Sequence, residues 1–149
     1  PRDRRQRQMC IRDRKTVYNG VSKGAYIIKD DDSPELIFLA TGSEVSLALE
    51  VSKLMNDKRV RVVSMPCWEL FDAQSKEYRD SIIPSRGAMK ISFEAGITLG
   101  WERYIGPNGL SIGLDRFGAS APGKDLAEEF GFTPQKVSEK IINHLKKLL

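Results

Sequence analysis

The fold is decided by the stretch LIFLATGSE, residues 36–44. Its first five residues are apolar without alternation, which is typical of a central strand buried on both faces. Thr41-Gly42-Ser43-Glu44 then turns the chain into a helix, where we expect Ser43 to cap the free backbone N–H groups. That helix carries one apolar stripe, made of Leu47, Ala48, Val51, Leu54 and Met55. The stretch therefore predicts a strand followed by a helix that lies on the sheet.

Strands and helices continue to alternate from Lys23 onward. Further strands are expected at residues 24–28, 60–65, 89–93 and 110–114, the first of them at a sheet edge. Helices are expected over residues 68–83, 96–104 and 122–131, and from Pro134, with Thr133 as N-cap. One face of the last helix holds Val137, Ile141, Leu145 and Leu148. The pattern predicts an α/β fold, a three-layer αβα domain with a mostly parallel sheet of about five strands.

The net charge of +4 comes from the beginning of the chain. Residues 1–15 hold seven basic and two acidic groups, whereas the rest holds 17 basic and 18 acidic groups. We interpret residues 1–15 as a disordered or non-native basic tail and residues 16–149 as one domain. A nucleic-acid binder working through this tail is an alternative, but the balanced body favours neither a nucleic-acid nor a membrane partner.

The cellular location is predicted from the absence of long apolar runs and from the spacing of the cysteines. No apolar run approaches the roughly 20 residues that span a bilayer, and no secretory signal pattern is present, so we expect a cytoplasmic protein. Cys10 and Cys67 lie far apart in sequence and outside any metal-ligand spacing, which indicates two reduced thiols.

The turn at Thr41, Gly42 and Ser43 is a candidate anion site. It lies at the carboxyl end of a strand and the amino end of a helix, where free N–H groups attract an anion. Such turns occur throughout α/β domains, and Glu44 adds a repelling charge, so simple helix capping is the competing interpretation. A regulatory module that binds phosphate here remains an alternative function.

Other candidate residues point to an interface. Glu94 ends a strand and could act as a base, but one acid without a matched second group favours a capping or interface role. The aromatic residues Trp68, Phe71, Trp101 and Tyr104 are interpreted as a docking surface. His144, the only histidine, has charged neighbours and is expected on a solvated helix face. No catalytic, cofactor-binding or metal-binding residue is assigned.

Five segments resemble the last domain of bacterial transketolases. They are Leu36-Ile37-Phe38-Leu39-Ala40-Thr41-Gly42-Ser43-Glu44-Val45, Val62-Val63-Ser64-Met65-Pro66-Cys67, Leu70-Phe71-Asp72-Ala73-Gln74, Phe117-Gly118-Ala119-Ser120-Ala121-Pro122 and Glu128-Glu129-Phe130-Gly131-Phe132-Thr133. They follow the order of the family over residues 20–149, while residues 1–15 match nothing in it.

The resemblance implies a role within a larger enzyme. Transketolases of the pentose phosphate pathway move a two-carbon ketol unit between sugar phosphates, using thiamine diphosphate and Mg²⁺ or another divalent metal. Their catalytic, cofactor and metal residues lie upstream of this domain, which helps to form the homodimer. We therefore expect a fragment that is inactive alone and binds no cofactor, or else the C-terminal subunit of a split transketolase.

Overall fold

The computed structural model describes residues 19–115 and 128–148 of the chain. The elements in chain order are β1 (Tyr26–Lys29), β2 (Leu36–Ala40), α2 (Glu44–Leu54), β3 (Val60–Ser64), α3 (Trp68–Asp72), α4 (Lys76–Ile82), β4 (Met89–Phe93), α5 (Glu102–Ile105), β5 (Leu110–Ile112) and α7 (Pro134–Leu148). The expected tail at residues 1–15 lies outside the described residues, as does most of the helix expected over residues 122–131, of which residues 128–130 are helical.

The strands of the described residues form one sheet in the order β1-β3-β2-β4-β5. The strand β2 lies at its centre and pairs in parallel with both β3 and β4, and β5 continues the parallel arrangement. At the opposite edge β1 runs antiparallel to β3, with a register irregularity between Ile27 and Lys29. The prediction of a mostly parallel sheet with an edge strand at its start is confirmed.

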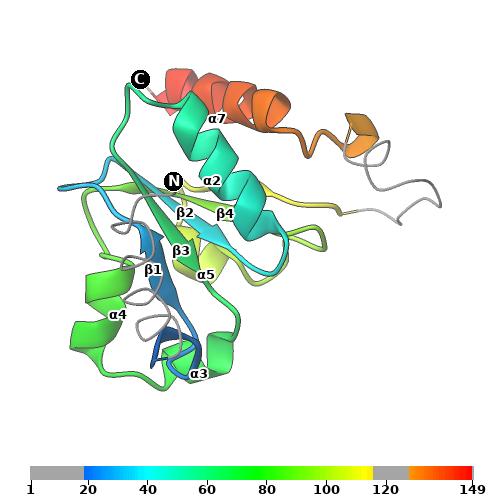
Figure 1. Cartoon of the computed structure of the whole chain (residues 1–149). Coiled ribbons are helices and arrows are strands. Elements are labelled where there is room, and N and C mark those ends of the chain that lie inside the picture. Colours follow the sequence, from blue (N-terminus) through cyan, green and yellow to red (C-terminus); the bar gives the residue numbers. More distant parts are fainter. Residues whose placement is uncertain (1–18, 116–127, 149) are drawn as a thin grey trace, which may run out of the picture.

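Alternate strand residues supply two separate cores, one on each face of the sheet. Phe38, Ile91 and their neighbours pack against α2 and α7, whereas Ile37, Leu39 and Val63 pack against α3, α4 and α5. Figure 1 shows α2 and α7 together on one side of the sheet and α3 and α4 on the other. Burying each of these large apolar side chains contributes about 1.5–3 kcal/mol. The three-layer αβα prediction is confirmed.

Each of the two expected apolar stripes has one member that is half exposed. Ala48, Val51 and Met55 of α2 are buried, but Leu54 is half exposed, at 50%. In α7, Val137 and Ile141 are buried and Leu145 packs against them, whereas Leu148 is 49% exposed in the last turn. In α2 the exposed residue lies beside a buried one, since Met55 still packs into the core.

The helix expected over residues 68–83 is divided into α3 and α4. The division falls at Ser75, whose hydroxyl oxygen accepts a hydrogen bond from the Tyr78 backbone N–H and so begins a new helix. Ser43 behaves differently from the prediction. Its hydroxyl donates to Glu44 Oε1 at 2.7 Å and makes no capping bond to a backbone N–H of α2.

Arg61 fixes α4 against the sheet. Its guanidinium group pairs with Asp30 at 2.7 Å and donates to the carbonyl oxygens of Ser81 and Ile82, at the end of α4. These carbonyls would otherwise lack partners at a helix C-terminus. The arginine thereby connects the end of α4 to β3.

Candidate functional site

The turn at Thr41, Gly42 and Ser43 lies between two carboxylates. Glu44 follows it at the start of α2, and Glu94 lies beside it because Ala40 pairs with Phe93 in the adjacent strand. Gly42 adopts a left-handed backbone with φ of 55°, and an added Cβ there would lie 3.8 Å from Glu44 Oε2, an ordinary contact distance. The anion site expected here stays a prediction, and the two negative groups next to the turn disfavour it.

Glu94 is a half-buried carboxyl group that directly follows β4. Its partial burial, and secondly the charge of Glu44, raise the pKa of Glu94 above its ordinary value of 4.5. The indole N–H of Trp101 acts in the opposite direction, although its nitrogen makes no hydrogen bond of normal geometry. A raised pKa suits a proton carrier, but no histidine joins it: the ring of His144 contacts the Asn108 carbonyl oxygen instead.

The four aromatic side chains that the sequence singled out form one cluster, termed here the aromatic cluster (Trp68, Phe71, Trp101 and Tyr104). The ring of Trp68 stands edge-on to Trp101 with centroids 5.1 Å apart, and Tyr104 lies 5.6 Å from Trp68 and 6.2 Å from Phe71. Trp101 is only 1% exposed and Phe71 only 3%. These two residues belong to the hydrophobic core and support the cluster from inside. The other three residues expected at an interface are partly exposed: Trp68, Tyr104 and Glu94.

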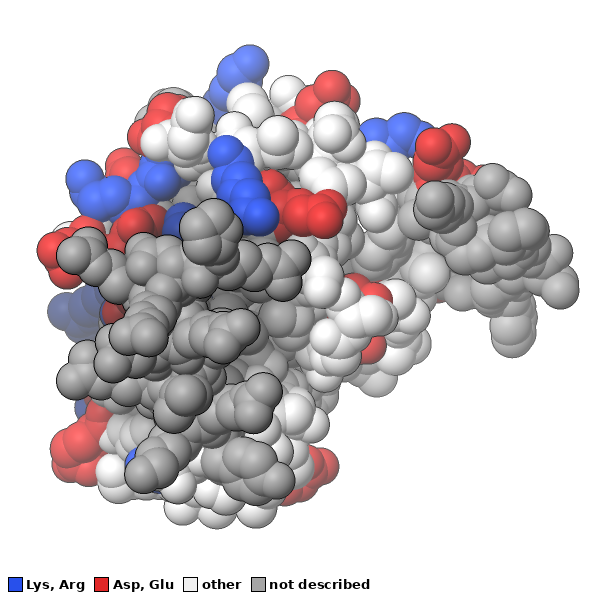
Figure 2. All heavy atoms as spheres, in the orientation of Figure 1, with Lys and Arg blue, Asp and Glu red and all other residues white. Residues whose placement is uncertain are grey.

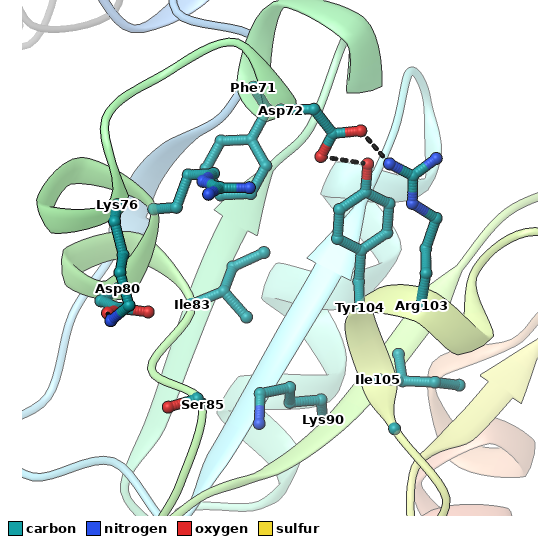
Figure 3. Close-up of a pocket in the computed structure, with 12 residues that line it drawn as sticks. Phe71, Asp72, Lys76, Asp80, Ile83, Ser85, Lys90, Arg103, Tyr104 and Ile105 are labelled. Carbon is teal, nitrogen blue, oxygen red and sulfur yellow. Dashed lines mark hydrogen bonds and ion pairs between the residues drawn. The ribbon is translucent and has the colours of Figure 1, made fainter.

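Three side chains lock the aromatic cluster to the end of α3. Asp72 Oδ1 accepts a hydrogen bond of 3.1 Å from the Tyr104 hydroxyl, and its other oxygen pairs with Arg103. Figure 3 shows Asp72 held between the two groups. Burial, and then the Asp72 carboxylate, raise the pKa of Tyr104 well above its usual range. Asp72 and Arg103 were not predicted from the sequence, although Asp72 lies within the family-like segment 70–74.

The loop between β4 and α5, residues 94–101, presents apolar side chains to solvent. Ile97 is 63% exposed and Leu99 is 69% exposed. Asp115 fixes this loop by accepting hydrogen bonds from the backbone N–H and the hydroxyl of Thr98, both within 2.9 Å. Gly100 packs so closely on Trp68 that an added Cβ would lie 2.8 Å from the ring. Two exposed apolar residues on a fixed loop indicate a contact surface.

The described residues bring together no set of reactive groups. They contain no cluster of three or more His, Cys, Asp or Glu side chains placed to bind a metal ion. Cys67 carries a free thiol that donates to Glu69 Oε2 at 3.3 Å. Within the same ranges, none of the helices combines the length and the apolar character that crossing a bilayer requires.

Charge on the surface is mixed. On the face drawn in Figure 2, the described basic and acidic side chains are interspersed without a field of one sign. This agrees with the nearly balanced composition after residue 15. A broad electrostatic footprint of the kind that binds nucleic acid is not visible on that face.

Comparison with known proteins places these features in a family. Residues 24–133 match the family model for the transketolase-like TK C-terminal domain. Transketolase 7 of Craterostigma plantagineum is 47% identical over 129 residues, which cover 82% of this chain and 19% of that protein. The crystallised transketolase from Leishmania mexicana superimposes with a TM-score of 0.79 at 43% identity, covering 87% of this chain and 19% of the other.

A more distant likeness concerns architecture alone. A structure described as a split gene transketolase, inactive beta4 tetramer, has a TM-score of 0.64 at 16% identity and is matched over 43% of its length. This chain spans about a fifth of the length of the curated relatives that it matches. Residues 24–133 form a transketolase-like C-terminal domain, and the chain belongs to the transketolase family.

Proposed function

We propose that this chain serves as the C-terminal domain of a transketolase and braces the catalytic domains and the homodimer. The complete enzyme transfers a two-carbon ketol unit between sugar phosphates. One observation carries the proposal: the chain matches the C-terminal domain of the family over residues 24–133 and supplies no convergent reactive set among its described residues. Its contribution to the enzyme is therefore to contact and support the other domains. We place the enzyme in the cytoplasm.

The loop of residues 94–101 supports the bracing role. Ile97 and Leu99 protrude from a segment that hydrogen bonds to Asp115 hold in place. A surface fixed before binding loses little conformational entropy when it meets a partner. Trp68 and Tyr104, half-buried beside the loop, extend this surface with aromatic area. We assign the upstream transketolase domains, in the same chain or in a partner subunit, as the occupant.

The described residues offer no site for the divalent metal that accompanies thiamine diphosphate. A divalent metal bound to a diphosphate requires several oxygen ligands, and no such grouping of Asp and Glu exists here. Glu94 has Glu44 as its charged neighbour, and the repulsion between them would not be relieved by a diphosphate. The cofactor and its metal belong, in this proposal, to the upstream domains.

Calorimetry provides the test of these roles. The 149-residue chain is titrated with thiamine diphosphate in the presence of Mg²⁺ and is assayed for ketol transfer between sugar phosphates. We expect no transfer and no heat of binding that requires Mg²⁺. Turnover by the chain alone, or micromolar binding of the cofactor that requires Mg²⁺, would overturn the proposal. A complementary assay adds the upstream domains of a transketolase as a separate polypeptide and measures the mass of the resulting complex.

A second candidate is the C-terminal subunit of a split transketolase. The observation that favours it is the likeness in architecture to the split gene transketolase structure. The genomic reading frame upstream of Pro1 distinguishes the two candidates. A continuous frame that encodes the cofactor domains supports a single chain, whereas a separate gene for those domains supports two subunits.

A further inference from the structure

A pocket of about 500 Å³ opens on the sheet face that carries α4 and α5. Its walls combine apolar side chains from Phe71, Ile83 and Ile105 with basic and hydroxyl groups. Figure 3 shows Lys90 and Ser85 near one end of the pocket and Asp72 with Arg103 near the other. The volume lies within the roughly 300–1,000 Å³ that small-molecule sites occupy.

The charges that line the pocket do not cancel. Four cations face two carboxylates: Lys76 pairs with Asp80, and Arg103 pairs with Asp72. The remaining two cations, Arg79 and Lys90, have no carboxylate partner within the described residues. The Arg79 Nε atom is buried and lacks any hydrogen-bond acceptor there. A surplus of two positive charges is therefore concentrated in one concave site.

Lys90 is the least expected of these groups. It occupies the second position of β4, a strand paired on both sides, and is only 8% exposed. Its ammonium nitrogen lies 3.5 Å from the Ala88 carbonyl oxygen, at the outer limit of a hydrogen bond. Burial lowers the pKa of Lys90 below its ordinary value of 10.5. A buried ammonium group of this kind calls for an anionic partner, because desolvation without one is costly.

We propose that this pocket binds a small phosphomonoester, with Lys90 and Arg79 as the groups that recognise its phosphate. A phosphomonoester carries a charge of about −1.5 to −2 near pH 7 and three acceptor oxygens, which matches the two unpaired cations and their donors. The Ser85 hydroxyl is a further donor in the same wall. Phe71, Ile83 and Ile105 cover the organic part of the ligand.

This inference goes beyond the bracing role and does not depend on it. The pocket lies at α4 and α5, whereas the anion site expected from the sequence was the turn at residues 41–43. The two locations differ in the charge of the side chains around them. Carboxylates flank the turn, and unpaired cations line the pocket.

Nuclear magnetic resonance with two probes tests the site on the 149-residue chain. Inorganic phosphate is titrated at constant ionic strength against chloride, and phenyl phosphate is then titrated in the same way. We expect saturable shifts of the backbone amides of Arg79, Ser85, Lys90 and Ile105. Phenyl phosphate should bind at least as tightly as inorganic phosphate, because its ring contacts the apolar wall.

Three variants make the test specific. Lys90→Met keeps the length of the side chain and removes its charge, so the fold should persist while phosphate affinity falls at least tenfold. The expectation follows from a charged hydrogen bond of about 1.5–3 kcal/mol, since 1.4 kcal/mol is a factor of ten. Arg79→Gln should weaken binding in the same direction. Lys53→Met, which removes an exposed charge on α2, should leave the affinity within twofold.

Two results would overturn the proposal. One is the absence of saturable shifts with either probe in a chain whose spectrum is folded. The other is an affinity that Lys90→Met and Arg79→Gln leave as unchanged as Lys53→Met does. Ketol transfer by the chain alone reports on the bracing role, and the phosphate titrations report on the pocket, so failure of one idea is separable from failure of the other.

Discussion

The Tyr104 hydroxyl donates a hydrogen bond of 3.1 Å to Asp72 Oδ1, joining two residues 32 positions apart. The bond links α5 to the end of α3, and Arg103 pairs with the other oxygen of the same carboxylate. Tyr104 also packs against Trp68 and Phe71. One side chain thus connects the aromatic cluster, the rim of the phosphate pocket and two helices.

Replacing Tyr104 with phenylalanine should lower the free energy of unfolding by about 1 kcal/mol, because the ring packing stays and one hydrogen bond to a charged group is lost. Arg103 still pairs with Asp72, which limits the loss. Urea unfolding monitored by tryptophan fluorescence measures the change. Tyr26→Phe is the control, since no hydrogen bond from the Tyr26 hydroxyl is present among the described residues. Equal stability of the two variants would contradict the assigned role of the bond.

Alkaline pH should unfold the protein partly through Tyr104. Its pKa is raised in the folded chain, so between the ordinary value of 10.0 and the raised value the unfolded state loses a proton that the folded state keeps. Stability therefore falls as the pH rises above 10. Tyr78, whose pKa is also raised by burial, adds to this slope. The Tyr104→Phe variant should show a shallower fall above pH 10 in thermal denaturation, and an identical slope would contradict the prediction.

Gly100→Ala should destabilise the chain by about 2 kcal/mol or more. Gly100 has a φ of 93°, and an added Cβ would lie 2.8 Å from the Trp68 ring. Gly87→Ala is a matched control, because its φ is 95° but no atom lies within 4 Å of its added Cβ. The control isolates backbone strain, so the difference in melting temperature between the two variants reports the steric contact with Trp68. Indistinguishable variants would show that the loop moves away from the ring.

Lys90→Met should raise the free energy of unfolding at pH 7 by about 1 kcal/mol, because a buried charge without a partner is replaced by an apolar chain of similar length. Lys90 has a lowered pKa in the folded protein, so between that lowered value and 10.5 the unfolded protein binds more protons than the folded protein. The penalty is present at neutral pH and disappears as the pH rises towards 10.5. Chemical denaturation at pH 7 and pH 10 should therefore show a difference between variant and original that shrinks with pH.

Ile97→Asp and Leu99→Asp should change association and leave folding alone. Both side chains are exposed, so the melting temperature of the chain should move by less than the equivalent of about 0.5 kcal/mol. Assembly with the upstream transketolase domains, measured by sedimentation, should weaken at least tenfold when both are changed. Leu54→Asp is the control: it is 50% exposed at the last residue of α2, whereas the loop begins beside Glu44, the first residue of that helix. Equal loss with Leu54→Asp would argue against the loop as the contact surface.

The framework of the fold follows from local patterns. The apolar run at residues 36–40 predicts a central strand, and β2 is paired on both sides as expected. The break between α3 and α4 was missed because residues 68–83 lack glycine and proline before Pro84, although Ser75 followed by Lys76 and Glu77 is a helix start that could have been recognised. Ser43 was misjudged because its own neighbour, Glu44, competes for its hydroxyl.

The pocket around Lys90 could not be predicted from the sequence, for a different reason. Met89-Lys90-Ile91-Ser92-Phe93 was recognised as a strand, but a lysine in it reads as an ordinary solvent-facing residue. Only the register of β4 between β2 and β5 turns Lys90 towards α4 and α5. A hint existed, because a central parallel strand is usually apolar throughout, and Lys90 and Ser92 interrupt that rule. The partners of such a residue depend on helices that lie elsewhere in the chain.

The two edge strands of the sheet affect how readily the protein can pair its strands with those of another molecule. On one side the outermost strand has four residues and an irregular register; on the other it has three. A short or distorted edge strand offers few backbone groups to a strand of another molecule. The longer, strongly apolar strands lie in the interior of the sheet. Within residues 19–115 and 128–148, the sheet therefore exposes no long apolar edge to which a second chain could add a strand.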